Sequence, residues 1–140
     1  MKRILGLDIG DKRIGVAISD PLGITAQSLE TINRIGKKKD VERIEEIIND
    51  YGVELIVSGN PINMNGTVGE RSEKTVAFAN YISNRTKIPV VFQDERLTTV
   101  SAESVLIEQG VRRENRKNHI DKVAATFILQ AYLDTNRGSD

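Results

Sequence analysis

The sequence predicts an α/β fold in which an antiparallel meander of strands continues into parallel strands, with helices on both faces of the mixed sheet. Two observations support this prediction. Residues 2–32 contain three short apolar or β-branched runs separated by turn-forming residues. From residue 40 onward, helical and strand-like periodicities alternate. Because a helix between two strands packs back onto the sheet, this alternation favours parallel pairing.

Three strands are expected first, at residues 2–9, 14–19 and 25–32. Gly10-Asp11-Lys12-Arg13 and Asp20-Pro21-Leu22-Gly23 have the composition of turns between them. Consecutive strands joined by turns this short pair antiparallel. This part of the chain therefore predicts the meander.

Helices and strands then alternate. Asp40 is expected as the N-cap of a helix that ends at Gly52, with these residues inward: Val41, Ile44, Ile47, Ile48 and Tyr51. Strands at residues 54–58 and 88–93 enclose a helix at about residues 72–85. The inner face of that helix is marked by Val76, Ala79 and Ile82.

Two more helices complete the prediction. One begins at Thr98 or Thr99 and ends at Gly110, and the last covers about residues 119–135. The inward face of the last helix consists of apolar residues at helical spacing: Ile120, Val123, Ala124, Phe127, Ile128 and Ala131. In such a sheet the carboxyl ends of the strands form the usual ligand crevice.

Length and composition limit the class of protein. The 140 residues, 39% of them hydrophobic, predict one domain covering residues 1–140. The absence of cysteine excludes disulfides, zinc–thiolate sites and thiol nucleophiles. No apolar run approaches the roughly 20 residues that span a bilayer, and Asp8 cuts the first apolar stretch short of a signal-peptide core. A cytoplasmic protein without a membrane partner is therefore expected.

Basic residues form two clusters although the net charge is zero. The early cluster is Arg34, Lys37, Lys38 and Lys39, and the late cluster is Arg112, Arg113, Arg116 and Lys117. This asymmetry suits a protein that meets phosphates on one face only. Solvated loop charges are the alternative interpretation of each cluster.

Three carboxylates stand at positions that packing alone explains poorly. Asp8 interrupts the apolar run at residues 4–9, Glu95 follows the strand at residues 88–93, and Asp121 opens the last helix. Aspartate is depleted in strands, and a charged group near a core is costly without a partner or a metal. These three residues are therefore the leading candidates for catalysis.

Each of the three also has an ordinary structural explanation. Asp8 could be a turn or edge-strand carboxylate, and Glu95 could be one of the charged residues that commonly follow strands. Asp121 is expected in the first turn of its helix, where a negative charge opposes the macrodipole and Asn118 would complete a capping box. The set of three nevertheless favours a shared site over three separate explanations.

If the three carboxylates converge, they form an oxygen-rich cage suited to Mg²⁺ or Mn²⁺. Without a cation, like charges this close together would raise the pKa of at least one of them. Two cations about 3.5–4 Å apart can activate water and stabilise the leaving oxygen of a phosphodiester. The cage therefore predicts a metal-dependent enzyme of phosphoryl transfer.

Several motifs now carry a resemblance to a known family over essentially the whole chain. They occur in this order: Leu-Asp8-Ile-Gly10 with Gly15-Val16-Ala17, Gly59-Asn-Pro61 with Asn-Gly66-Thr, Asp94-Glu95-Arg96-Leu-Thr-Thr99, and Arg116-Lys117 before Ile120-Asp121-Lys-Val-Ala-Ala125. This set resembles the YqgF family, also called RuvX, of pre-16S rRNA nucleases with an RNase H-like fold. The resemblance implies Asp8, Glu95 and Asp121 as the acidic active-site and metal-binding residues.

The resemblance further implies removal of extra sequence from the 5′ end of a ribosomal RNA precursor, with Holliday-junction resolution as an older assignment. Asn60 stands where the family more often has Leu, and Asn65 stands where Asp is common. RNase H-like enzymes often have a fourth carboxylate, for which Asp94 and Asp11 are candidates only. Two ions are therefore expected, the second with substrate phosphate as a ligand.

Substrate contacts are expected from the cations near these acids: Arg96, Arg112, Arg113, Arg116 and Lys117. An ion pair of Arg96 with Glu95, and an exposed interhelical loop for the others, are the alternatives. His119 is either a general acid or, more simply, a surface or capping residue. Aromatic residues make up 4% of the chain, and three phenylalanines are expected in the core, Phe78, Phe92 and Phe127. Backbone recognition is therefore favoured over base stacking.

Three other functions remain open at this point. Junction resolution would require two active sites related by a two-fold axis, and nothing in the sequence fixes the oligomeric state. Asp8-Ile-Gly10 with Gly15-Val-Ala also resembles the first phosphate loop of actin-like ATPases and sugar kinases, for which the chain is short. A non-catalytic RNA-binding module for ribosome assembly would bind nucleic acid without cutting it.

Overall fold

The computed structural model describes residues 3–60, 69–94 and 113–136. Within these ranges, the side chains of residues 70, 71, 94, 113–123 and 136 are not described. Glu95, Arg96, Arg112 and the helix expected between Thr98 and Gly110 lie outside the described residues.

A five-stranded mixed sheet forms the centre of the molecule, with the strand order β3-β2-β1-β4-β5. The first three strands are β1 (Arg3–Ile9), β2 (Arg13–Ser19) and β3 (Ala26–Asn33). Strand β2 pairs antiparallel with both β1 and β3. Strands β4 (Val53–Asn60) and β5 (Val90–Asp94) continue the sheet parallel to β1. The predicted meander followed by parallel strands is confirmed.

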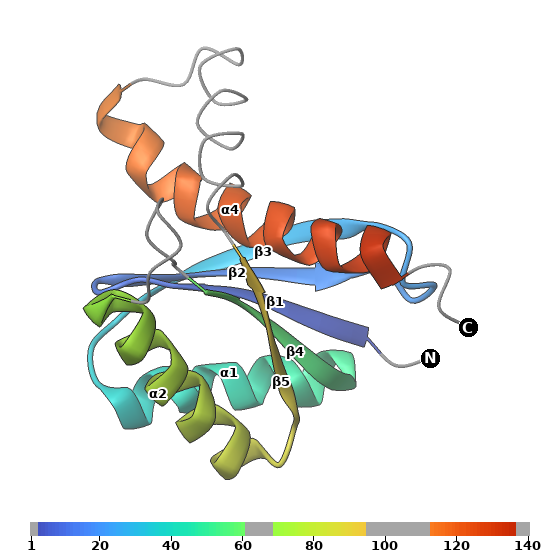
Figure 1. Ribbon diagram of the computed structural model, residues 1–140, viewed down its shortest axis with the longest axis horizontal. Helices are drawn as coiled ribbons and strands as arrows, with labels where there is room; N and C mark the ends of the chain where they lie inside the picture. The colour runs from blue at the N-terminus through green and yellow to red at the C-terminus, as the bar shows by residue number, and fades with distance from the viewer. Residues whose placement is uncertain (1–2, 61–68, 95–112, 137–140) are drawn as a thin grey trace.

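Helices cover both faces of this sheet (Figure 1). Helices α1 (Lys37–Tyr51) and α2 (Glu70–Thr86) lie on one face, and α4 (Arg113–Asn136) crosses the other face. Among the described residues, none of the helices combines the length and the apolarity that a bilayer span requires.

Side-chain alternation along β1 divides the core into two layers. Leu5, Leu7 and Ile9 belong to the larger cluster beneath α1 and α2. The intervening positions, Gly6 and Asp8, face α4, because successive side chains of a strand point to opposite faces. The smaller cluster on that side contains Ala17 and Val57 from the strands and these residues of α4: Ala125, Ile128, Leu129 and Leu133. Asp8 therefore lies on the face that α4 covers.

Helix α1 begins four residues earlier than predicted, at Lys37 with Gly36 rather than Asp40 as its N-cap, so the prediction that Asp40 is the N-cap was wrong. Asp40 is instead a buried residue of the first turn, 2% exposed. Its carboxylate accepts a hydrogen bond from the Ile35 N–H at 3.1 Å and pairs with the Arg34 guanidinium at 3.3 Å. Asp40 thus ties the β3–α1 connection to the helix from inside its first turn.

Replacing Asp40 with asparagine should lower the free energy of unfolding by about 1–2 kcal/mol, near the value of one charge-assisted hydrogen bond. The amide retains an acceptor for the Ile35 N–H but removes the charge that pairs with Arg34, whose side chain is 24% exposed. Urea denaturation would measure the loss. An unchanged unfolding midpoint would show that water replaces the ion pair without cost.

Helix α4 also begins earlier than predicted, at Arg113 rather than near His119. The added turns, Arg113 to Asn118, are polar and show no apolar periodicity, so the apolar pattern could not reveal them. Asp121 lies eight residues after the first residue of α4, and the placement of Asp121 in a first turn, with Asn118 in a capping box, was wrong. The macrodipole acts within the first turn, so it no longer explains Asp121.

The predicted inner faces are partly corrected as well. Phe92 is 37% exposed because β5 is an edge strand, and Phe127, Ala131 and Val76 are only half-buried. The buried stripe of α4 runs through Ala124, Ala125, Ile128, Leu129 and Leu133 instead. Phe78 is buried as predicted, and α1 buries its predicted residues except the half-buried Tyr51.

A candidate active site at the carboxyl end of β1

Asp8 is a buried carboxylate at the carboxyl end of β1, with 8% of its surface exposed. It lies opposite Gly15 of β2 in the antiparallel register. On the other side, Leu7 pairs with Ser58, so the next position of β4, Gly59, borders Asp8. Both neighbouring positions are glycines, so neither adjoining strand places a side chain beside Asp8 on the α4 face.

Close packing against Gly6 fixes the distance between β1 and α4. A Cβ atom at Gly6 would lie 2.8 Å from the Leu129 Cβ and 3.1 Å from the Ala125 carbonyl oxygen. Only a glycine permits this approach of strand and helix. Asp8 lies two residues further along the same face of β1.

The direction of α4 follows from the side chain of Gln130. Its Oε1 accepts a hydrogen bond from the Ala26 N–H at 2.8 Å, and its Nε2 donates to the Ile24 carbonyl at 3.0 Å. Ala26 pairs with Ser19, whose hydroxyl accepts from the Ile4 N–H. Gln130 therefore lies near the start of β1, whereas Ala125 and Leu129 meet Gly6. Residues of α4 with lower numbers therefore lie closer to Asp8, and Figure 1 shows that α4 begins at the end of the sheet where β1 ends.

This arrangement determines where the backbone of Asp121 lies. One helical turn rises about 5.4 Å, and two strand residues cover about 6.7 Å. Asp121 is one turn before Ala125, and Asp8 is two residues beyond Gly6. The two steps run in the same direction along the sheet, so the backbone brings the Asp121 position toward Asp8.

Strand β5 ends at the same end of the sheet as β1, because both strands run parallel to β4. Gly59 pairs with Gln93 and Asn60 pairs with Asp94, so Glu95 follows directly on the strand end in sequence. Two strand spacings separate β5 from β1, about 9.5 Å. Among the side chains that the structure describes, no three acidic or histidine residues form a metal-binding group. The predicted cage thus depends on two side chains outside that part, those of Glu95 and Asp121.

The remaining predicted residues divide into two groups. Arg113, Arg116 and Lys117 lie within α4, so their predicted place before the last helix was wrong, whereas His119 lies in that helix as predicted, although not at its start. The side chains of all four residues are not described. The first turns of α4 lie at the end of the sheet where β1 ends (Figure 1). Arg96 and Arg112 lie outside the described residues.

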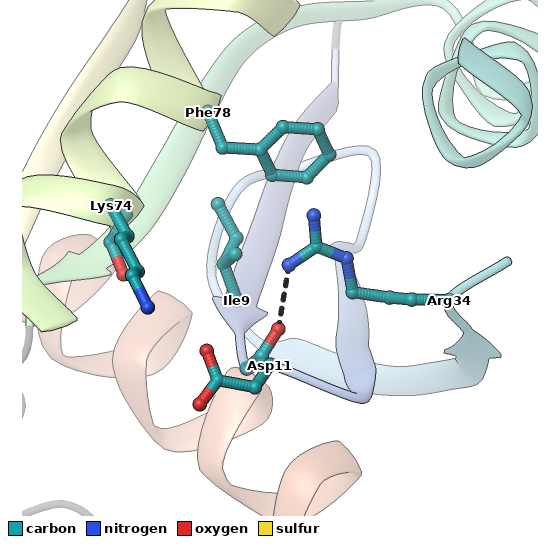
Figure 2. A pocket seen from close by; sticks show the side chains of 7 residues that line it. Ile9, Asp11, Arg34, Lys74 and Phe78 are labelled. Carbon is teal, nitrogen blue, oxygen red and sulfur yellow. Dashed lines mark hydrogen bonds between the residues drawn. The ribbon is translucent and has the colours of Figure 1, made fainter. Parts of the chain in front are cut away.

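The structure places Asp11 away from Asp8, around the β1–β2 turn on the side of α2. There it lines a pocket of about 210 Å³ together with Arg34 and Lys74 (Figure 2). Arg34 donates through Nη1 to the Gly10 carbonyl at 2.8 Å, and its Cζ lies 4.4 Å from the centre of the Phe78 ring. Sequence reasoning assigned Arg34 to a basic cluster and did not predict its pairing with Phe78, because no local spacing connects the two residues.

Comparison with known proteins decides the family. The family model described as "RuvX: Holliday junction resolvase" matches residues 2–135. The chain belongs to the RuvX family. Its fold and its sequence motifs agree with this assignment, which confirms the resemblance found in the sequence.

Two relatives from clostridia are similar over nearly the full length. A protein of Clostridium novyi (strain NT), named "Putative pre-16S rRNA nuclease", is 51% identical over 133 residues, 95% of this chain and 98% of the relative. A protein of the same name from Clostridioides difficile (strain 630) is 54% identical over 132 residues, 94% of each chain.

Solved structures show the same fold at low sequence identity. The RuvC of T. thermophilus in complex with a Holliday junction substrate is 14% identical with a TM-score of 0.63, covering 99% of this chain and 98% of that chain. The fowlpox virus Holliday junction resolvase is 16% identical with a TM-score of 0.55, covering 95% and 99%. The RNase H-like fold class predicted from the sequence is thereby confirmed.

Proposed function

We propose that this chain is a divalent-metal-dependent nuclease that hydrolyses phosphodiester bonds in structured RNA and processes the 5′ end of pre-16S rRNA. One observation carries the proposal: a buried carboxylate, Asp8, stands among glycines where the ends of β1 and β4 meet the face covered by α4. Membership of the RuvX family and the name of the two clostridial relatives support the choice of reaction and substrate. Such a role would place the protein in the cytoplasm with the ribosomal precursors.

The surroundings of Asp8 fit a cation. Hard cations such as Mg²⁺ and Mn²⁺ are held by carboxylate oxygens and keep several water molecules, which need space. Gly15 and Gly59 place no side chain beside Asp8, whereas a Cβ at either position would project on the same face. Asp8, Glu95 and Asp121 would hold the metal, which when bound supplies a nucleophilic water at neutral pH and neutralises phosphate charge.

Residues of the chain itself position the acidic groups of the site and supply positive charge for the phosphate backbone. Asp8 is fixed by two neighbouring strands, and α4 is held against β1 by the close contact at Gly6 and by Gln130. Rigid placement of the reacting groups is a large part of phosphodiester hydrolysis. Arg113, Arg116 and Lys117, with Arg96 and Arg112, would bind the phosphate backbone beside this site. A second ion would bind with substrate phosphate as one of its ligands.

Holliday-junction resolution is the second candidate, because the family model carries that description. It would use the same acidic residues on branched DNA. It would also require a two-fold dimer, since paired strands are cut by symmetry-related sites.

The test is cleavage of two labelled substrates by the pure protein, a pre-16S rRNA fragment and a four-way DNA junction. Each is incubated with Mg²⁺, with Mn²⁺ or with EDTA. We expect metal-dependent cutting of the RNA and little cutting of the junction. Preferential cutting of the junction by a dimeric protein would favour the second candidate. Binding of the RNA without any metal-dependent product would contradict both candidates and indicate an assembly module.

A further inference from the structure

A pocket beside the β1–β2 turn is separate from the Asp8 site but lies at the same end of the sheet. Its volume is about 210 Å³, and it is lined by the turn, the β3–α1 connection and α2: Ile9, Gly10, Asp11, Arg34, Lys74, Thr75 and Phe78. Ile9 points to the α1 and α2 face, whereas Asp8 points to the α4 face. The pocket and Asp8 thus stand on opposite sides of one strand end.

Arg34 is held in a fixed orientation at this pocket. Its Nη1 donates to the Gly10 carbonyl, its Nε faces the buried Asp40 carboxylate, and its guanidinium stacks on Phe78. A guanidinium has five N–H donors. The Nη2 group makes no hydrogen bond to any residue in the described part of the chain. Arg34 therefore presents an ordered donor pair that the fold itself does not use.

The charged side chains that line the pocket favour an anion, because two are cationic, Arg34 and Lys74, and one is anionic, Asp11. Lys74 reaches the pocket from α2, and Figure 2 shows its ammonium group across the pocket from the Arg34 guanidinium. The early basic cluster continues from Arg34 into the first turn of α1, with Lys37, Lys38 and Lys39. Among the residues that line the pocket, Asp11 is the one carboxylate, and it opposes an incoming anion.

The volume of the pocket limits the size of that anion. Drug-sized ligands occupy pockets of about 300–1,000 Å³. The pocket is smaller than such sites, and its volume suits a single phosphate group.

We propose that the Arg34–Lys74 pocket binds a backbone phosphate of the nucleic-acid substrate, at a nucleotide away from the one that is cut. This proposal rests on the proposed nuclease function and extends its substrate contacts. The substrate would cross the end of the sheet, with its scissile phosphate on the α4 side and a second phosphate on the α2 side. Arg34 of the early basic cluster would then contact the same substrate as the Asp8 site.

The test measures binding of a labelled pre-16S rRNA fragment in EDTA by fluorescence anisotropy at several salt concentrations. We expect Lys74→Gln to raise the Kd about 5- to 20-fold and to lower the slope of log K against log salt by about 1, as for the loss of one phosphate contact. Arg34→Lys should act in the same direction. Asp11→Asn should lower the Kd about 3- to 10-fold, because it removes the opposing charge.

Lys87→Gln is the matched control, since Lys87 follows the other end of α2 and is also exposed. Its Kd and salt slope should equal those of the wild type. A gain of affinity in Asp11→Asn cannot arise from a folding defect. If Lys74→Gln, Asp11→Asn and Lys87→Gln all bind the RNA equally well, the proposal that this pocket binds a phosphate is wrong. Cleavage by the wild-type protein is measured in parallel. If the variants bind like the wild type but the wild type cleaves RNA, the pocket proposal fails and the nuclease proposal stands. If the variants bind as expected but the wild type does not cleave RNA, only the nuclease proposal fails.

Discussion

Asp8→Asn should abolish metal-dependent cleavage, with a loss of at least about 1,000-fold in kcat/KM. Metal ions contribute several kcal/mol of charge stabilisation in phosphoryl transfer, and each 1.36 kcal/mol corresponds to a tenfold change in rate. The amide has the shape of the carboxylate but not its charge, so the variant should fold. Cleavage of the pre-16S rRNA fragment in Mn²⁺ measures the effect.

A second measurement separates loss of metal from loss of fold. Ligands that bind only the native state raise its stability. Mn²⁺ should therefore raise the melting temperature of the wild type but leave that of Asp8→Asn unchanged. Asp50→Asn is the matched control, because Asp50 is exposed near the end of α1, remote from Asp8. Wild-type activity in Asp8→Asn would remove Asp8 from the active site, and an equal loss in Asp50→Asn would point to a general effect of charge.

The sequence predicts the fold well because its signals are local. Asp40 to Gly52 has apolar residues at helical spacing, and α1 buries that face. The turn residues between β1 and β2 predict a hairpin, and its register is antiparallel as expected. Alternation and turn chemistry depend only on neighbouring residues, so one chain is enough to find them.

The site is harder to predict because it depends on pairing between distant strands. Asp8 was found as an interruption of an apolar run, and the structure buries it. The importance of Gly59 depends on β4 lying beside β1, which local patterns do not specify. The start of α4 was missed because Arg113 to Asn118 project no apolar face into the core, although Arg, Glu and Lys favour helices. The contact between Arg34 and Phe78 joins residues that lie 44 positions apart in the chain, so no local pattern could predict it.

Gly6→Ala should affect stability and activity together, because Gly6 sets how closely α4 approaches β1. The added Cβ would lie 2.8 Å from the Leu129 Cβ and 3.1 Å from the Ala125 carbonyl, and neither atom is the end of a flexible side chain. Overpacking of this kind costs about 1–3 kcal/mol. We expect a loss of about 2–3 kcal/mol in the free energy of unfolding, measured by urea denaturation.

The same substitution should lower cleavage by about 10- to 100-fold under conditions where the variant remains folded. A helix displaced from β1 moves the Asp121 position away from Asp8, and small errors of placement at a reacting group are costly. Gly36→Ala is the matched control, since a Cβ there meets no atom within 4 Å and its φ of 164° is ordinary extended backbone. Its stability should stay within about 1 kcal/mol of the wild type, with full activity. A stable and fully active Gly6→Ala variant would show that α4 does not position the active site, and Asp121 would then lose its proposed role.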